Sequence, residues 1–226
     1  IKRTNSIIKY RSRNLTELLN NSLLKNPDQK ILGEKINGTW KWITCRDLLA
    51  KTNSCFDTIS NNRLDIGDRI VYKGKNSIDW VAWNIATNSW GCSWVPLYSN
   101  QTNQHSQYII DNCNPTLFIT DDIENTNVKN TRIISNKIVV EDHNYHKPLT
   151  IEPITTLANI IYTSGTTGNP KGVMLSHENI ISNIESINTR FKAFNNKNLT
   201  SLNILPWAHI YGLTAELYYN ILNNNK

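Results

Sequence analysis

In this chain of 226 residues, the segment Tyr162–His177 holds the densest group of side chains that could take part in binding or catalysis. It reads Tyr-Thr-Ser-Gly-Thr-Thr-Gly-Asn-Pro-Lys-Gly-Val-Met-Leu-Ser-His. Glycines let backbone N–H groups approach an anion, while hydroxyl groups and an ammonium add further donors. We expect a polyphosphate to bind at Thr163, Ser164, Gly165, Thr166, Thr167, Gly168 and Lys171.

Apolar runs stand on both sides of this loop. Leu157–Ile161 before it and Val173–Leu175 after it predict two buried strands, so the loop should lie at the tip of a hairpin. A Walker-type phosphate loop needs Gly-Lys-Ser/Thr at the start of a helix, whereas Lys171 stands between Pro170 and Gly172 and leads into a strand. The Walker interpretation is therefore excluded, and a Gly/Thr-rich hairpin without a ligand is the alternative.

Four segments together resemble one family. Tyr162–Gly172 is similar to the signature of the adenylate-forming superfamily, which includes acyl-CoA synthetases, luciferases and peptide-synthetase adenylation domains. Gly67–Ile70 and Val95–Tyr98 resemble its Gly-Asp-Arg-Val and Val-Pro-Leu-Tyr segments, and Leu205–Gly212 carries Leu-Pro-x-x-His-x-x-Gly. The resemblance extends from about Leu15 to the end of the chain.

The resemblance implies a domain organisation. We expect residues 1–226 to form an incomplete N-terminal adenylation (AMP-binding) domain, with a basic extension at 1–13 and without the C-terminal domain. Ile1 in place of an initiator Met, and an abrupt end at Lys226 after an apolar segment, support this expectation. In the family, the adenine and ribose sites and a catalytic lysine follow later in the sequence.

The resemblance also implies a reaction. A carboxylate attacks the α-phosphorus of ATP, pyrophosphate leaves, and CoA then takes the acyl group; the enzyme supplies positioning and charge neutralisation. The positive charge of Lys171 would contact either the phosphates or an acidic partner that fixes the loop. Thr166 would help to hold Mg²⁺. The usual glutamate partner lies in a Tyr-Gly-x-Thr-Glu motif; Tyr211–Glu216 resembles it with one residue inserted, but we interpret Glu216 as an ordinary helix residue.

The substrate class is suggested by the second motif. The resemblance makes His209 the second candidate catalytic residue beside Lys171. In acyl-CoA synthetases the matching residue lies between the acyl chain and the adenylate phosphate, where an imidazole N–H can bond an oxygen of the mixed anhydride; a core histidine is the alternative. Amino-acid-activating relatives place an Asp here, and residues 205–216 contain none, which favours a plain carboxylic acid. The block is most similar to long-chain fatty acyl-CoA synthetases. A long-chain fatty acid–CoA ligase is therefore the first hypothesis; a ligase of aryl or shorter acids and a non-catalytic nucleotide-binding remnant are the alternatives.

Strand and helix patterns alternate along the chain. Strands are predicted at 69–72, 94–97, 116–120 and 202–205, and helices at 15–26, 45–59, 77–90, 104–112 and after Ser176. This alternation predicts an α/β fold with layered, parallel-rich sheets flanked by helices on both faces. Asn37-Gly38 predicts a hairpin, and Thr44 the N-cap of the helix that follows.

Two further groups of apolar residues are assigned to the core. The helix after Ser176 should direct Ile180, Ile184, Ile187 and Phe191 inward. The tryptophans at 80, 83, 90 and 94 are interpreted in the same way.

Charge and cysteine usage limit the partners. The net charge is +6, from 24 basic and 18 acidic residues, but scattered lysines argue against a nucleic-acid footprint. The basic residues at 1–13 favour a solvated extension, with peripheral membrane contact or a targeting remnant as alternatives.

The four cysteines are too far apart for a metal or redox pair, and indicate reduced, half-buried thiols in a cytoplasmic protein. His143 and His146 have no third ligand in sequence, so no metal site is expected there. The oligomeric state stays open.

Overall fold

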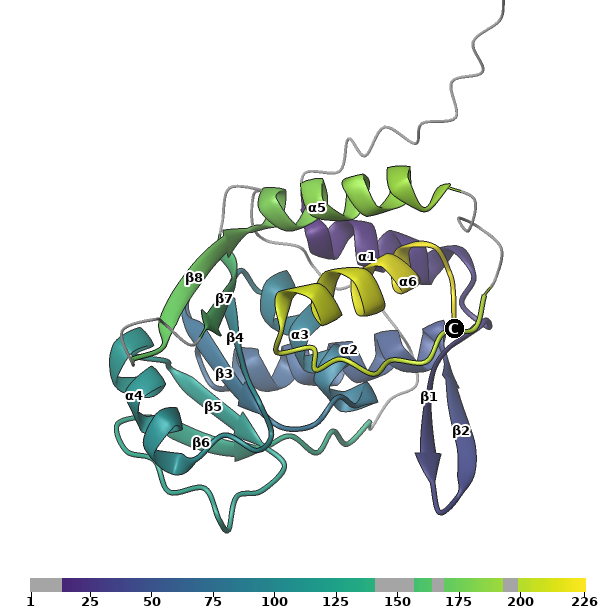
Figure 1. Ribbon diagram of the computed structural model, residues 1–226. Helices are drawn as coiled ribbons and strands as arrows, with labels where there is room; N and C mark the ends of the chain where they lie inside the picture. The colour runs from purple at the N-terminus through teal and green to yellow at the C-terminus, as the bar shows by residue number, and fades with distance from the viewer. Residues whose placement is uncertain (1–13, 141–156, 164–168, 193–198) are drawn as a thin grey trace, which may run out of the picture.

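A computed structural model describes residues 14–140, 157–163, 169–192 and 199–226. Its centre is a six-stranded sheet in the order β6-β5-β3-β4-β7-β8 (Figure 1). The strands are β3 (Arg69–Lys73), β4 (Ser93–Leu97), β5 (Leu117–Thr120), β6 (Arg132–Ser135), β7 (Leu157–Thr163) and β8 (Lys171–Ser176). All neighbours pair in parallel except β7 and β8, which are antiparallel. A separate two-stranded hairpin joins β1 (Lys30–Ile36) to β2 (Thr39–Thr44).

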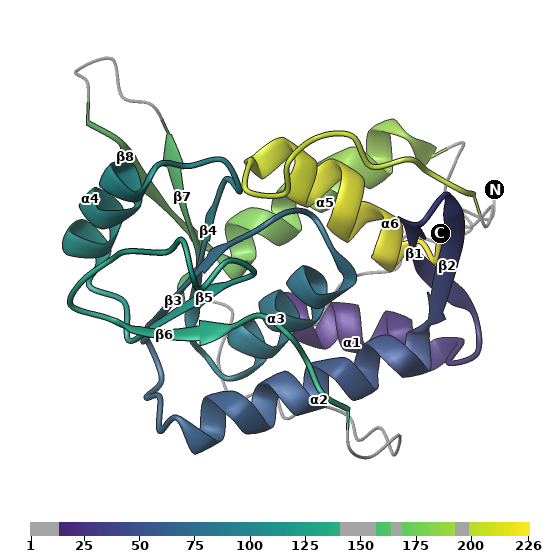
Figure 2. The ribbon, with the colours of Figure 1, turned by 90° about the horizontal axis from the view of Figure 1, so that it is seen from below.

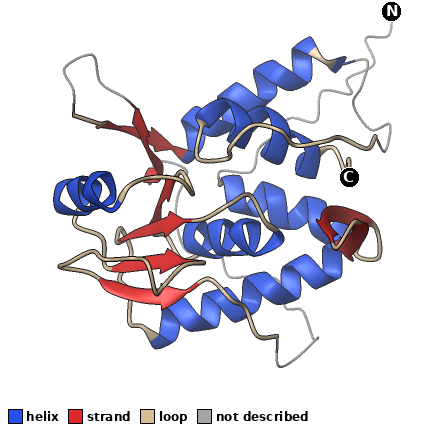
Figure 3. Cartoon of the chain, turned by 60° about the horizontal axis from the view of Figure 1, so that its bottom comes forward, coloured by secondary structure: helices blue, strands red, loops and turns tan. Residues whose placement is uncertain are grey.

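Helices cover both faces of the sheet. They are α1 (Leu15–Lys25), α2 (Cys45–Asn61), α3 (Ile78–Ser89), α4 (Asn103–Cys113), α5 (His177–Arg190), the π-helix η2 (Gly212–Tyr218) and α6 (Tyr219–Leu222). Figures 1 and 3 show α4 on one side of the sheet and the other helices on the opposite side. Along β3, Val71 packs in the cluster with α4, while Ile70 and Tyr72 pack in the larger cluster with α3. This alternation follows from the two-residue period of a strand, and the predicted α/β fold is confirmed.

Side-chain caps determine where several helices begin. The Thr44 hydroxyl accepts a hydrogen bond from the Asp47 N–H at 3.2 Å, and the Asp47 carboxylate accepts the Thr44 N–H at 2.9 Å. Ser176 caps α5 with the same reciprocal pair of bonds, to Asn179, and the Ser77 hydroxyl caps α3 by accepting the Trp80 N–H. These caps satisfy N–H groups that have no partner inside the helix, and the cap predicted at Thr44 is confirmed.

The β1–β2 turn also follows the prediction. Asn37 has φ 48° and Gly38 has φ 82°. Positive φ at both central residues matches the twist of the flanking strands, which explains the choice of Asn-Gly.

The predicted strand at 202–205 is wrong, because the structure has no strand there. Leu202 and Ile204 are 67% and 77% exposed, and the Ile204 N–H donates to the Glu216 carboxylate instead of to a neighbouring strand. Alternating apolar residues form a strand only when another strand supplies the ladder of carbonyls. β6, which was not predicted, is the opposite case: this four-residue strand pairs with β5.

The core assignments hold for part of α5. Ile180 and Ile184 are 1% exposed, whereas Ile187 is only partly buried and Phe191 is 46% exposed. The core assignment of Phe191 is wrong, because this residue is the C-cap of α5, where the backbone leaves helical geometry with φ −100° and ψ 26°. The tryptophans at 80, 83 and 94 are buried as predicted, and Trp90 is partly buried.

The cysteines are free thiols, as predicted, and more deeply buried than expected. Burial raises the pKa of the Cys45 thiol to about 11. Among the described helices, none combines the length and apolar character needed to cross a bilayer. The predicted basic extension at 1–13, and His143 and His146, lie outside the described residues.

Candidate functional site

The predicted hairpin of β7 and β8 is present. The expectation that Val173–Leu175 forms a buried strand is wrong, because β8 lies at the edge of the sheet and Val173 and Met174 are 44% and 70% exposed. β7 pairs with β8 so that Thr163 lies opposite Lys171 and Tyr162 opposite Gly172, and the side chains of Thr163 and Lys171 are both exposed. The five predicted loop residues between them, Ser164, Gly165, Thr166, Thr167 and Gly168, lie outside the described residues. The strands therefore direct the two ends of the loop to the same place.

Close packing supports the base of this hairpin. The Tyr162 hydroxyl donates to Asn112 Oδ1 at 2.6 Å, which ties β7 to α4. Burial raises the pKa of Tyr162, so its hydroxyl stays a donor at neutral pH. A Cβ at Gly172 would lie 2.9 Å from Ile160 Cγ2 and 3.0 Å from the Tyr162 ring. Glycine is therefore needed here for the close contact between the two strands.

His209 lies directly before the helical segment that contains η2. Its N–H donates to the Pro206 carbonyl at 3.0 Å, and its Nδ1 accepts the Tyr211 N–H at 3.2 Å. An accepting Nδ1 places the proton of a neutral imidazole on Nε2. The side chain is exposed, so the alternative of a core histidine is wrong. His209 can offer an Nε2–H donor to a ligand.

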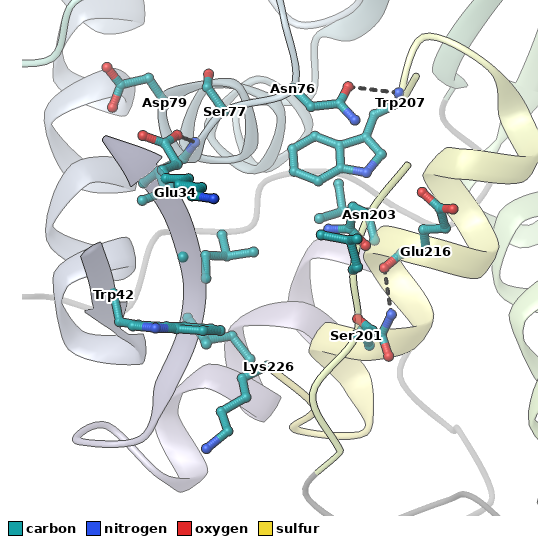
Figure 4. Close-up of a pocket in the computed structure, with 18 of the residues that line it drawn as sticks. Glu34, Trp42, Asn76, Ser77, Asp79, Ser201, Asn203, Trp207, Glu216 and Lys226 are labelled. Atoms are coloured by element: carbon teal, nitrogen blue, oxygen red, sulfur yellow. Dashed lines mark hydrogen bonds between the residues drawn. The ribbon is translucent and has the colours of Figure 1, made fainter. Parts of the chain in front are cut away.

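Asn76, which the sequence did not single out, holds the backbone of this segment. Its Nδ2 donates to the Leu205 carbonyl at 2.8 Å, and its Oδ1 accepts the Trp207 N–H at 2.9 Å (Figure 4). The available signal was an Asn directly before the N-cap Ser77, at the end of the loop after β3.

Glu216 holds the same segment from the other side. Its Oε2 accepts the N–H groups of Ile204 at 3.2 Å and Leu205 at 3.0 Å. Glu216 is a helix residue, as interpreted from the sequence, and its carboxylate also has this tertiary role.

Gly212 and Trp207 set how closely the motif approaches the fold. A Cβ at Gly212 would lie 2.6 Å from the Pro206 carbonyl oxygen, so the start of η2 can contact that backbone only with glycine. Trp207 is 4% exposed and packs edge-on against Trp80 of α3, with ring centroids 5.5 Å apart. π-helical turns are uncommon and are frequently found at functional sites.

The structure places the two predicted catalytic residues on different elements. Lys171 begins β8, and His209 precedes η2. In the part of the chain that the structure describes, no hydrogen bond or ion pair joins them. A ligand that contacts both must bridge the two elements.

Comparison with known proteins identifies the family. The profile described as "AMP-binding enzyme" matches residues 19–224. The chain belongs to the AMP-binding enzyme family. This match covers the hairpin, the His209 segment and all the described strands.

Relatives within the AMP-binding family differ in substrate. Tyrocidine synthase 2 of Brevibacillus parabrevis is 27% identical over 177 residues, covering 75% of this chain and 5% of that protein. Long chain acyl-CoA synthetase 3 of Arabidopsis thaliana is 26% identical over 235 residues, covering 86% of this chain and 35% of that protein. Long-chain acyl-CoA synthetases are thus among the relatives. The chain spans about a third or less of the length of these two proteins.

A solved structure confirms the fold of this AMP-binding chain. The fatty acyl-adenylate ligase from L. pneumophila, in complex with acyl adenylate and pyrophosphate, superposes with a TM-score of 0.84 at 22% identity. The match covers 95% of this chain and 39% of that one. The described arrangement of strands and helices is therefore that of an adenylate-forming enzyme's N-terminal part.

A cavity of about 1000 Å³ lies beside the His209 segment of this AMP-binding domain (Figure 4). Its walls come from the β1–β2 hairpin, the start of α3, residues 200–203 and the helix that contains Glu216. Figure 2 shows α6 near the β1–β2 hairpin. The Ser22 hydroxyl of α1 donates to the Ile221 carbonyl of α6 at 2.8 Å, which joins these two helices. Asn76 and Trp207 line the cavity, whereas Lys171 and His209 do not. The cavity is therefore adjacent to the predicted site and distinct from it.

A buried histidine follows the phosphate hairpin. His177 is the first residue of α5, is 0% exposed, and has no hydrogen-bond partner for either ring nitrogen among the described residues. Burial lowers its pKa from 6.5 to about 4. The neutral ring is the form that this position accommodates, because a buried imidazolium would have no compensating charge.

We therefore expect acid to destabilise the fold through His177. Its pKa is lower in the folded chain than in the unfolded one, so the unfolded state binds more protons below about pH 6.5. The contribution of neutral His177 to the free energy of unfolding is fully present above pH 6.5. It falls by about 3 kcal/mol as the pH approaches 4. Urea unfolding of His177→Leu should show a flatter loss between pH 7 and pH 4.5, whereas His105→Asn, at an exposed position, should keep the wild-type slope. An unchanged slope in His177→Leu would contradict the assignment.

Proposed function

We propose that the full gene product activates a long-chain fatty acid with ATP and transfers the acyl group from the adenylate to CoA. The observation that supports a plain carboxylic acid is that the Glu216 carboxylate is already occupied by hydrogen bonds. It is the only acidic residue in 199–226, and its Oε2 already accepts two backbone N–H groups. No other carboxylate in this segment is available to hold a substrate ammonium, as amino-acid activation would require.

The proposed chemistry divides between two elements. A carboxylate oxygen of the substrate attacks the α-phosphorus, and the bond from that phosphorus to the oxygen bridging to the β-phosphate breaks. The Lys171 ammonium, at the start of β8, reduces the negative charge of the phosphates. The Tyr211 N–H donates to His209 Nδ1, which leaves the proton of the neutral ring on Nε2. This Nε2–H donates to an oxygen of the forming mixed anhydride.

The remaining loop residues belong to the same proposal. Thr163 is exposed at the end of β7, and we propose that it binds phosphate together with residues 164–168. A role for Thr166 in holding Mg²⁺ stays a prediction, because Thr166 lies outside the described residues. Within the described ranges, no group of three or more His, Cys, Asp or Glu side chains could hold a metal ion.

We further propose a cytoplasmic protein that does not bind nucleic acid. The buried free thiols support a reducing compartment. Peripheral membrane contact through residues 1–13 remains the alternative to a solvated extension, and the oligomeric state stays open.

Exchange of radiolabelled pyrophosphate into ATP tests the proposal directly. Because the first half-reaction is reversible, we expect the full gene product to exchange pyrophosphate into ATP when palmitate is present. Amino acids should support no exchange. Exchange supported by benzoate or butyrate instead would favour a ligase of aryl or shorter acids. Exchange that depends on an amino acid would contradict the substrate class, and its absence with every acid would favour a nucleotide-binding remnant.

A further inference from the structure

The Asn76 side chain joins two parts of the fold that are far apart in sequence. It lies in the loop after β3 and bonds residues 129 and 131 positions away, the Leu205 carbonyl and the Trp207 N–H. These two bonds enclose Pro206. A primary amide both donates and accepts in one plane, so neither a carboxylate nor an aliphatic side chain can make both contacts.

The bonds of Asn76 continue to His209 through the backbone. The Pro206 carbonyl accepts the His209 N–H at 3.0 Å, so the position of that peptide fixes the His209 backbone directly before the helical segment. Tyr211 then donates to His209 Nδ1 at 3.2 Å, which leaves Nε2 as the donor. A displaced Pro206 would therefore change the direction of the imidazole.

The anchoring end of this connection is rigid. β3 pairs with both β4 and β5, and Ser77 next to Asn76 caps α3. Ligands of parallel α/β sheets bind outside the carboxyl ends of the strands, and Asn76 follows the carboxyl end of β3. Asn76 thus connects the binding edge of the sheet to the segment that carries His209.

We infer that Asn76 is a positioning residue for His209, and this inference rests on the proposed adenylation. Its amide holds the peptide on each side of Pro206 so that the His209 Nε2–H faces the forming acyl-phosphate bond. Asn76 itself need not contact the substrate.

A double-mutant cycle in the full gene product tests this role. We expect Asn76→Ala to lower kcat for palmitate-dependent pyrophosphate exchange by about 10- to 100-fold and to leave the KM for ATP within about twofold, since small misplacements are costly for chemistry. Asn76→Asp keeps the acceptor for Trp207 and loses the donor to Leu205, so its loss should be similar. In a His209→Ala background, Asn76→Ala should cause no further loss. Asn136→Ala, at another amide lining the cavity, is the matched control and should keep wild-type exchange.

Histidine ring ¹⁵N shifts supply a readout that needs no catalysis. Wild-type protein labelled at histidine should show a His209 signal with protonated Nε2 and accepting Nδ1, assigned by its loss in His209→Ala. Asn76→Ala should move that signal toward a mixture of tautomers. Unchanged ring shifts, or losses that multiply in the double mutant, would overturn the inference. If the wild-type protein shows no pyrophosphate exchange with any of the acids, the proposed function fails. The ring shifts still decide whether Asn76 orients His209.

Discussion

Replacing Lys171 by alanine should lower ATP use by the full gene product about 10- to 150-fold. Lys171 is exposed at the first position of β8, in register with Thr163, so its ammonium lies at the base of the predicted phosphate loop. Loss of one charge-assisted contact costs roughly 1.5–3 kcal/mol, which corresponds to that change in rate or affinity. Initial rates of pyrophosphate exchange at varied ATP concentration measure it.

Two further variants make the Lys171 result specific. Lys129→Ala, at an exposed residue in the loop before β6, should leave the ATP dependence unchanged. His209→Ala should reduce the acid-dependent rate while changing the ATP requirement little. If Lys171→Ala and His209→Ala raised the ATP requirement equally, with fatty-acid dependence untouched, the division of roles between the two elements would be wrong.

Gly212→Ala should reduce both stability and acid-dependent exchange. The new Cβ would lie 2.6 Å from the Pro206 carbonyl oxygen and 3.2 Å from Leu205 Cβ, and the first of these is backbone that cannot rotate away. Overpacking of this kind costs about 1–3 kcal/mol, more than the gain of up to about 1 kcal/mol from replacing glycine in a helix. Because Pro206 also accepts the His209 N–H, exchange should fall by up to about 100-fold.

A second glycine supplies the control for Gly212. Gly38 has φ 82° and open space around its Cβ position, so Gly38→Ala should cost about 1–2 kcal/mol through backbone strain alone. Thermal unfolding should therefore detect both variants, whereas only Gly212→Ala should impair exchange. Wild-type exchange in Gly212→Ala would show that the position of Pro206 does not control the site.

The patterns that succeeded are those whose cause lies within a few residues. Thr44 caps α2 through Asp47 three positions later, and Asn37-Gly38 turns the chain between two adjacent strands. The hairpin from Leu157 to Ser176 was predicted for the same reason, since both strands and the loop are contiguous.

The patterns that failed depended on partners elsewhere in the chain. Leu202–Leu205 has the composition of a strand, yet the N–H of Leu205 bonds to Glu216 and not to a sheet. Phe191 fits the helical period of α5 but is its C-cap, directly after the last helical residue. The short strand β6 forms because β5 offers it a parallel edge.

The sequence by itself determined most of the helices and strands, the hairpin of β7 and β8 and the motif that contains His209, because propensity, caps and periodicity act over short distances along the chain. Only the tertiary structure decided which nitrogen of His209 carries the proton, that its ring is exposed, and that Asn76 and Glu216 hold the backbone before it. The two Asn76 contacts require that the loop after β3 meets a segment about 130 residues later. The packing of the sheet and helices creates that meeting, and no local pattern encodes it.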